Sequence, residues 1–290
     1  MQLTQPTTRT LEAPGATLTY DVRPGSGGGI PLFLIGSPMG AAGFGSLASH
    51  FPDRTIITYD PRGAERSTKA DPSTESNPDQ HADDLHRIID EVGGPVDLFA
   101  SSGGAVNALA LVATHPEDVR TLVAHEPPLA SILPDAENAK AAVRAVSDSY
   151  QRGGFGAGMT HFMAITSHRG PFPYDIAQKP VPDPSMFGMP TEDDGSRTDV
   201  MLAQNIINTS HYEPVFEALR AASTRIVIAA GIESDGEMAN RGAHAVAERL
   251  GIEPVIFPSH HGGFLGGEYG WPGEPDAFAA KLRDVLDAED

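Results

Sequence analysis

A serine at a strand–helix junction is the residue of this chain best suited to covalent chemistry. Residues 96–99 form a short apolar run, residues 100–104 read Ala-Ser-Ser-Gly-Gly, and an Ala- and Leu-rich segment follows. This order predicts a strand, a very tight turn and a helix. Small neighbours permit the strained backbone that pushes a serine hydroxyl out beyond the end of the strand. The pattern predicts a nucleophile here, although similar turns also occur without a catalytic role.

Two adjacent serines compete for this position. Ser102 has small residues two places away on both sides, at Ala100 and Gly104. Ser101 has Phe99 two places before it, and a phenylalanine would crowd such a turn. We therefore expect Ser102 to be the nucleophile.

A serine hydroxyl needs a neighbouring base that takes its proton, and histidine is the usual choice. The chain has 11 histidines, so that most of them must have other roles. His260 and His261 follow a predicted strand at 254–257 and precede the last predicted helix, in a loop that contains glycine. The order of elements allows either histidine to return to the serine turn.

A catalytic histidine in turn needs a carboxylate that holds its orientation. One candidate is Glu126, at the carboxyl end of the strand next to the serine strand, where Pro127 and Pro128 turn the chain out of the sheet. In open α/β sheets, functional groups gather beyond these strand ends. The other candidates are Glu233 and Asp235, which follow a later predicted strand. We favour Glu126 and keep Asp235 as the main alternative.

These residues depend on a framework of strands that alternate with helices. The predicted strands cover 16–22, 30–35, 55–59, 96–99, 119–124, 225–230 and 254–257, and the predicted helices between and after them cover 80–92, 105–114, 237–250 and 276–286. Such alternation predicts an α/β fold with a mostly parallel, doubly wound sheet.

The alternation stops in the middle of the chain. Between 131 and 220 we expect helices at 136–150, 155–166 and 199–208, and a loop rich in Pro, Gly and Asp at 168–197. This predicts a core formed by 1–130 and 221–290, with residues 131–220 inserted as a helical cap.

The composition excludes several classes of protein. There are 39 acidic and 20 basic residues, and a net charge of −19 would repel nucleic acids and anionic membranes. The chain has no cysteine, so a thiolate nucleophile and a disulfide are both excluded. It has neither a signal-peptide pattern nor about 18 consecutive apolar residues. We expect a cytoplasmic protein that acts on a small molecule, as a monomer or as a homo-oligomer.

The ordered set of motifs resembles the α/β-hydrolase superfamily. The shared features are a loop after the third strand, the stretch YDPRGAERS after the fourth, the serine turn, a cap and a late histidine. Of the two histidines, His261 matches the superfamily pattern better, and His260 is then expected to pack or hydrogen-bond. The superfamily's usual acid, in a Gly-x-x-Asp pattern after the strand at 225–230, is replaced here by Ser234.

A closer likeness is to zearalenone-lactonase-like enzymes of that superfamily. They carry a double serine in the turn and a His-Glu-x-Pro motif after the next strand, and this chain has His125-Glu126-Pro127-Pro128 there. The resemblance implies that Glu126 is the acid of a Ser-His-Glu triad.

Two backbone amides are expected to stabilise the oxyanion of the reaction. One is the N–H of Gly103, which follows the nucleophile. The other belongs to the loop after the strand at 30–35. Because Pro38 has no N–H group, we expect Ser37 to be this donor.

The expected activity is hydrolysis of a carboxylic ester or lactone of an apolar or aromatic molecule through an acyl-enzyme, without a cofactor or a metal ion. Adjacent side chains such as His260 and His261 cannot easily face one ion. The alternatives are a cofactor-free haloperoxidase (perhydrolase) and a ligand-binding protein with an inactive triad. Apolar residues on cap helices most often pack internally, but some are expected to form the substrate pocket. The candidates are Met159, Phe162, Met163, Phe187, Met189 and, beyond His261 in the chain, Trp271, which either anchors its loop or forms a wall of the pocket.

Overall fold

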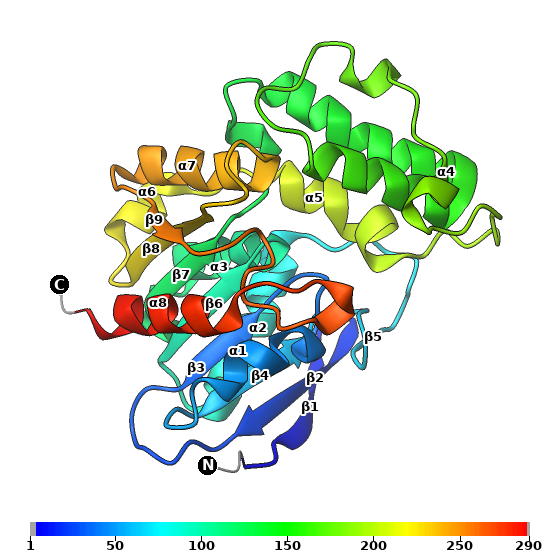
Figure 1. Cartoon of the computed structure of the whole chain (residues 1–290). Coiled ribbons are helices and arrows are strands. Elements are labelled where there is room, and N and C mark those ends of the chain that lie inside the picture. Colours follow the sequence, from blue (N-terminus) through cyan, green and yellow to red (C-terminus); the bar gives the residue numbers. More distant parts are fainter. Residues whose placement is uncertain (1–3, 289–290) are drawn as a thin grey trace.

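The computed structural model describes residues 4–288, and over this range nine strands form one sheet (Figure 1). The strands are β1 (Thr7–Ala13), β2 (Ala16–Arg23), β3 (Leu32–Ile35), β4 (Ile56–Asp60), β5 (Thr68–Lys69), β6 (Val96–Ser101), β7 (Val119–His125), β8 (Arg225–Gly231) and β9 (Val255–Phe257).

The sheet has the order β1-β2-β4-β3-β6-β7-β8-β9, with β5 paired to β2. The strands from β4 to β9 along this order are parallel, whereas β1 and β2 are antiparallel to their neighbours. The carboxyl ends of the parallel strands therefore meet at one edge. Ser101 at the end of β6 pairs with His125 at the end of β7, which pairs with Ala229 near the end of β8.

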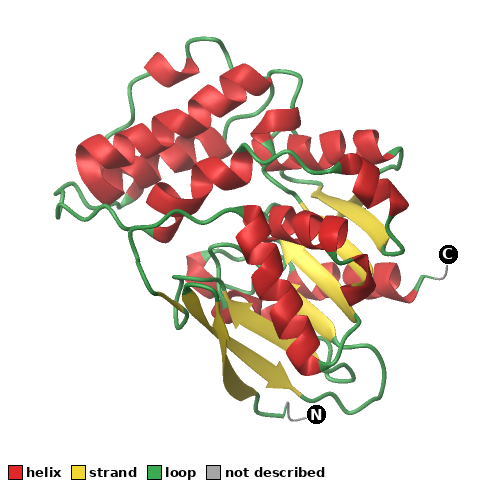
Figure 2. Cartoon of the chain, turned by 180° about the vertical axis from the view of Figure 1, so that it is seen from behind, coloured by secondary structure: helices red, strands yellow, loops and turns green. Residues whose placement is uncertain are grey.

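Helices cover both faces of this sheet, as the predicted doubly wound α/β fold requires. Figure 1 shows α1 and α8 in front of the strands, and Figure 2 shows the opposite face covered by other helices. The helices are α1 (Gly45–Ser49), α2 (Pro78–Val92), α3 (Gly103–Thr114), α4 (Ala136–Thr166), α5 (Ile206–Ser210), α6 (Phe216–Ala221), α7 (Met238–Leu250) and α8 (Pro275–Asp287). Over the described residues, none of them is both long and apolar enough to span a membrane.

The core is divided by the sheet into two apolar layers. Side chains alternate along a strand, so that Leu32 and Leu34 of β3 face α1 and α8, whereas Phe33 and Ile35 face α2 and α3. Buried parallel strands lack polar alternation for this reason, and the predicted apolar runs were correct for them.

One strand was missing from the prediction. The alternation along residues 16–22 predicts an edge strand. This strand is β2, and it does not lie at the edge of the sheet because β1 pairs with it. The residues of β1 are mostly exposed and include three threonines, so that this strand carries no apolar pattern.

The region between β7 and β8 is built from helices. Its longest element, α4, contains the two predicted helices at 136–150 and 155–166, separated by a kink at Gly154 with φ of 74°. The kink needs glycine, because a Cβ atom there would lie 2.4 Å from Oδ1 of Asp193. Figure 1 shows α4 and α5 as a group that stands beside the sheet rather than on either face.

Short helical segments complete the chain. They are η1 (Ala41–Phe44), η2 (Pro116–Asp118), η3 (Ala130–Ile132), η4 (Ile176–Gln178), η5 (Pro184–Phe187), the π-helical η6 (Val200–Asn205) and η7 (Glu268–Gly270). The predicted helix at 199–208 corresponds to η6 and α5, and the predicted loop at 168–197 contains η4 and η5.

Candidate active site

The junction of β6 and α3 is a turn of a single residue. β6 ends at Ser101 and α3 begins at Gly103, and Ser102 between them has φ of 57° and ψ of −128°. This conformation is strained for a residue with a side chain. It is held by the N–H of Ser102, which donates to the carbonyl oxygen of His125 at 2.9 Å. A Cβ atom on Gly104 would lie 2.8 Å from Cα of Gly36, so that the turn also requires glycine there.

The two serines occupy different environments. Ser101 is buried at the end of β6, and its Oγ hydrogen-bonds Nδ1 of His125 at 3.2 Å. Ser102 is partly exposed and has the left-handed backbone of the turn. The structure therefore confirms that Ser102, and not Ser101, lies at the turn.

The loop after β3 lies against the start of α3. A Cβ atom on Gly103 would be only 2.6 Å from the carbonyl oxygen of Ser37. Gly103 is the first residue of α3, so that its N–H has no acceptor within the helix. Ser37 and Gly103 are thus neighbours beside Ser102, while their role as oxyanion donors stays a prediction.

The predicted contact between Glu126 and His261 is present. Oε2 of Glu126 lies 2.5 Å from Nδ1 of His261. Glu126 follows β7, is completely buried and has φ of 49°. Asp235, the alternative acid, is exposed. Of the carboxylates weighed from the sequence, the one on the strand next to β6 thus reaches the histidine.

The second oxygen of Glu126 is held by three donors that the sequence analysis missed. Oε1 accepts hydrogen bonds from the N–H of Gly231 at 2.8 Å, from Nδ2 of Asn240 at 3.1 Å and from the hydroxyl of Ser234. Ser234 stands where the superfamily usually has its acid. Its position after Gly231 is the one signal in the sequence that could have suggested a role.

These contacts keep the Glu126 carboxylate charged. Burial by itself raises the pKa of Glu126, but the hydrogen bond to His261, the nearby His125 and the Ser234 hydroxyl together hold it well below its usual range. The contact between Glu126 and His261 has the opposite effect on the pKa of the histidine. Burial lowers the pKa of His261, but the Glu126 carboxylate outweighs it and raises the pKa above 6.5.

The two adjacent histidines have separate partners. The side chain of His261 is 29% exposed and bonds Glu126. His260 points to another part of its loop, where Nε2 lies 3.1 Å from the carbonyl oxygen of Pro272 and Nδ1 accepts from the N–H of Gly262 at 3.0 Å. His260 thus makes hydrogen bonds of the kind expected for it, while the choice of His261 as the base stays a prediction.

Comparison with known proteins identifies the family of this chain. The sequence model of the alpha/beta hydrolase fold matches residues 32–201, more than half of the chain. This chain belongs to the α/β-hydrolase family. It is 30% identical over 286 residues to the uncharacterized hydrolase YraK of Bacillus subtilis (strain 168), covering 97% of this chain and 96% of that protein.

Solved structures of other α/β-hydrolases share the fold. E-2-(acetamidomethylene)succinate hydrolase superposes with a TM-score of 0.63 at 20% identity, over 98% of this chain and 100% of that one. A thermophilic esterase from Thermogutta terrifontis superposes with a TM-score of 0.64 at 18% identity, over 97% and 98% of the two chains. At these identities the likeness concerns the fold alone.

A third histidine of this α/β-hydrolase lies beneath the Glu126–His261 pair. The ring of His125 is buried, and its centroid lies 5.9 Å from that of the His261 ring. Phe257 and Phe278 pack around it. Burial lowers the pKa of His125 to about 4, against an upward effect of Glu126.

His125, Glu126 and His261 place possible ligand atoms within 4.8 Å of one another. A metal ion would have to replace the hydrogen bond between Glu126 and His261 and enter an aromatic pocket. We therefore interpret the group as a hydrogen-bonded acid–base pair.

The residues predicted to bind substrate are spread over two parts of this hydrolase. Met159 and Phe162 of α4 are partly buried against the core, and Met163 is also partly buried. Phe187 is 38% exposed. The chain that follows it lies close to α4, where Pro190 contacts Gly156. The remaining two are Met189, which is partly buried, and Trp271, which is 52% exposed next to the Pro272 carbonyl that binds His260.

Proposed function

We propose that this hydrolase cleaves a carboxylic ester or lactone of an apolar or aromatic small molecule through a Ser102–His261–Glu126 triad. The observation that carries the proposal is the hydrogen bond between Glu126 and His261. It joins a charged, buried carboxylate to a histidine at the sheet edge where the strained Ser102 turn also lies.

In the proposed reaction, Oγ of Ser102 attacks the carbonyl carbon of the substrate and its proton passes to His261. Because Nδ1 of His261 bonds Glu126, Nε2 is the nitrogen that takes this proton. The negative oxygen of the tetrahedral intermediate accepts hydrogen bonds from the N–H groups of Gly103 and Ser37. The carbon–oxygen bond of the ester then breaks, and His261 returns the proton to the leaving alcohol.

Water completes the cycle. His261 removes a proton from a water molecule that attacks the acyl carbon, and a second tetrahedral intermediate forms at the same amides. Its collapse releases the carboxylic acid and returns the proton to Ser102. In a lactone, the alcohol and the acid belong to one molecule, so that the product is a single hydroxy acid.

The substrate class rests on the helical region and on motif resemblance. We propose that residues 131–220 form a cap over the strand ends and that Met159, Phe162, Met163, Phe187 and Met189 of this cap, with Trp271, line an apolar pocket. Methionine side chains adapt to ligands of different shape. We include lactones because two motifs resemble those of zearalenone-lactonase-like enzymes. These are the double serine Ser101–Ser102 and the His-Glu-x-Pro motif at His125–Pro128.

A fluorophosphonate probe tests the nucleophile. We expect wild-type protein and S101A to gain the mass of the phosphonyl group, and S102A to gain none. On a panel of aryl esters and aromatic lactones, S102A should lose at least about 10³-fold in kcat/KM. Labelling that is retained in S102A and lost in S101A would overturn the assignment.

The same panel separates the alternatives. A ligand-binding protein would turn over neither esters nor lactones. A perhydrolase would convert a carboxylic acid with hydrogen peroxide faster than it hydrolyses the corresponding ester. Faster hydrolysis of esters or lactones supports the proposed function.

A further inference from the structure

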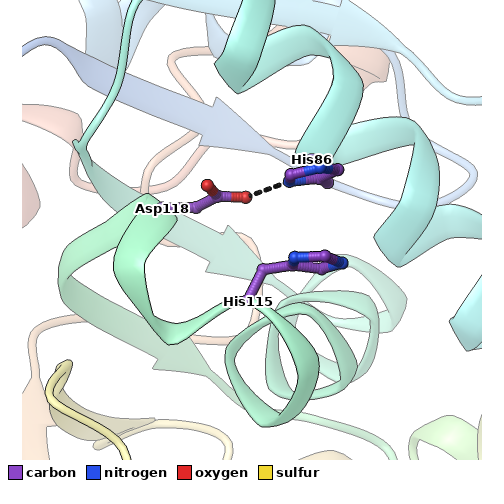
Figure 3. Close-up of side chains that lie close together, drawn as sticks. All are labelled: His86, His115 and Asp118. Atoms are coloured by element: carbon purple, nitrogen blue, oxygen red, sulfur yellow. Dashed lines mark hydrogen bonds and ion pairs between the residues drawn. The ribbon is translucent and has the colours of Figure 1, made fainter.

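A second group of chemically reactive side chains lies on the side of the molecule away from Ser102. It consists of His86 on α2, His115 at the end of α3, and Asp118 in η2 (Figure 3). Possible ligand atoms of these three residues all lie within 4.8 Å of one another. We propose that they bind a divalent transition metal ion, with zinc as the reference case.

The donor set fits such an ion. Two imidazole nitrogens and one carboxylate oxygen form a ligand set suited to Zn²⁺, whereas Ca²⁺ and Mg²⁺ prefer oxygen alone. The carboxylate of Glu117 lies 3.5 Å from Nδ1 of His115 and adds a second negative charge beside the group. Water completes the coordination.

The possible ligand atoms are already close together, although the two rings are nearly parallel. Figure 3 shows the two rings lying one above the other, with the Asp118 carboxylate at the edge of His86. The ring centroids are 3.8 Å apart with an angle of 12° between the planes, and Oδ2 of Asp118 is 2.6 Å from Nδ1 of His86. Zinc–nitrogen bonds of about 2.0–2.1 Å place ligand atoms of a tetrahedral site about 3.3 Å apart. Binding therefore requires the rings to tilt toward one another.

The surroundings allow this movement and keep the donors together. The side chains of His86 and His115 are 33% and 34% exposed, so that both rings have room to turn. Asp118 is more buried, and its N–H donates to the carbonyl oxygen of His115 at 3.2 Å, which couples two of the donors through the η2 turn. Two stacked imidazolium rings would repel each other, whereas two neutral rings present the lone pairs that a metal needs.

The proposed ion would act on the scaffold rather than on the reaction. α3 has 12 residues between the serine turn and His115, a length of about 18 Å. A metal there would join α2 to the end of α3 and to the start of β7, whose other end carries Glu126. We therefore expect it to stabilise the fold, because a ligand that binds only the native state shifts unfolding to higher temperature.

Calorimetric titration of the full chain with ZnCl₂ tests the site. We expect one Zn²⁺ per chain, a dissociation constant at least tenfold higher in H86A, H115A and D118N, and little change in H244A, which removes an exposed histidine of α7. Saturating Zn²⁺ should raise Tm by at least about 3 °C in the wild type and not in H86A/H115A.

A second variant excludes the other histidine group. If H261A retains the tight Zn²⁺ event, the ion does not bind at the Glu126–His261 pair. Three results would overturn the proposal. They are the absence of 1:1 Zn²⁺ binding in the wild type, the loss of this binding in H261A, and equal Zn²⁺ affinity in the wild type and in H86A/H115A. The near-isosteric D118N shows that weaker binding is not caused by unfolding, provided that its circular dichroism matches the wild type.

Discussion

Ser234 donates its hydroxyl hydrogen to Oε1 of Glu126, the carboxylate whose other oxygen binds His261. A serine thus occupies the place of the superfamily's usual acid and hydrogen-bonds a glutamate that follows the neighbouring strand. In the proposed triad, the carboxylate therefore stands at the end of β7, and the residue after β8 supplies a hydrogen-bond donor to it. A glutamate suits this position because its longer side chain spans the distance to the histidine.

Replacement of Glu126 by Gln should lower kcat by about 10³–10⁴-fold, because an amide cannot stabilise the imidazolium and can favour the wrong tautomer of His261. The matched control is D235N, which alters an exposed carboxylate and should leave kcat close to that of the wild type. Steady-state kinetics on the best ester of the panel measure both. A severe loss in D235N, with a mild one in E126Q, would exclude Glu126 as the acid.

The pH dependence of the reaction should follow His261. Because the base must be neutral, kcat/KM should fall as the pH drops through the pKa of His261, which lies above 6.5. Glu126 raises this pKa more than the more distant Glu237 does, so that in E126Q the acidic limb should move to lower pH. An NMR titration of the His261 ring in both proteins measures the shift independently of turnover. An unchanged pKa in E126Q would contradict the assignment.

A swap of the acid between strands tests the link between Ser234 and Glu126. E126A should be nearly inactive, and the double variant E126A/S234D should recover part of the lost kcat, because it returns a carboxylate to the position of the usual acid. The control is E126A/D235E, in which the added length lies on an exposed side chain and should give no recovery. Equal kcat in E126A and E126A/S234D would show that position 234 cannot serve His261.

Protonation of His125 should weaken the fold at acidic pH. The pKa of His125 is about 4 in the folded chain against 6.5 as the ordinary value, so that the unfolded chain binds the proton first. The neutral His125 ring makes its full contribution to the free energy of unfolding above pH 6.5, and this contribution falls as the pH drops toward 4. Between pH 7 and pH 5 the free energy of unfolding should decrease by about 2 kcal/mol from this cause.

Urea denaturation of the wild type and of H125N at pH 7 and pH 5 checks this expectation. The free energy of unfolding of H125N should fall by about 2 kcal/mol less over this interval, since asparagine does not titrate. Its absolute stability is also expected to differ, because Ser101 hydrogen-bonds the histidine, and the comparison therefore concerns the pH dependence alone. Parallel losses in the two proteins would show that His125 does not account for the acid sensitivity.

Local sequence patterns were sufficient for much of the fold. Apolar runs located the strands that are buried on both faces, and the small residues around Ser102 located the turn, because these features depend on neighbours within a few residues. Gly154 illustrates the limit. Two helices were predicted on either side of it, but the sequence did not show that they run on as α4 across a kink, where Asp193 lies close to the glycine. β1 was missed because its exposed threonines carry no apolar signal.

The sequence by itself determined which chemistry was available: a serine in a strained turn, two late histidines, and carboxylates after two different strands. Only the tertiary structure decided which carboxylate meets His261, that Ser234 and Asn240 hold the same glutamate, and that His86 and His115 stack although 29 positions separate them. The physical reason is that hydrogen bonds and metal coordination are effective only within a few ångströms. The register of parallel strands and the packing of helices set distances on that scale, whereas separation along the chain does not.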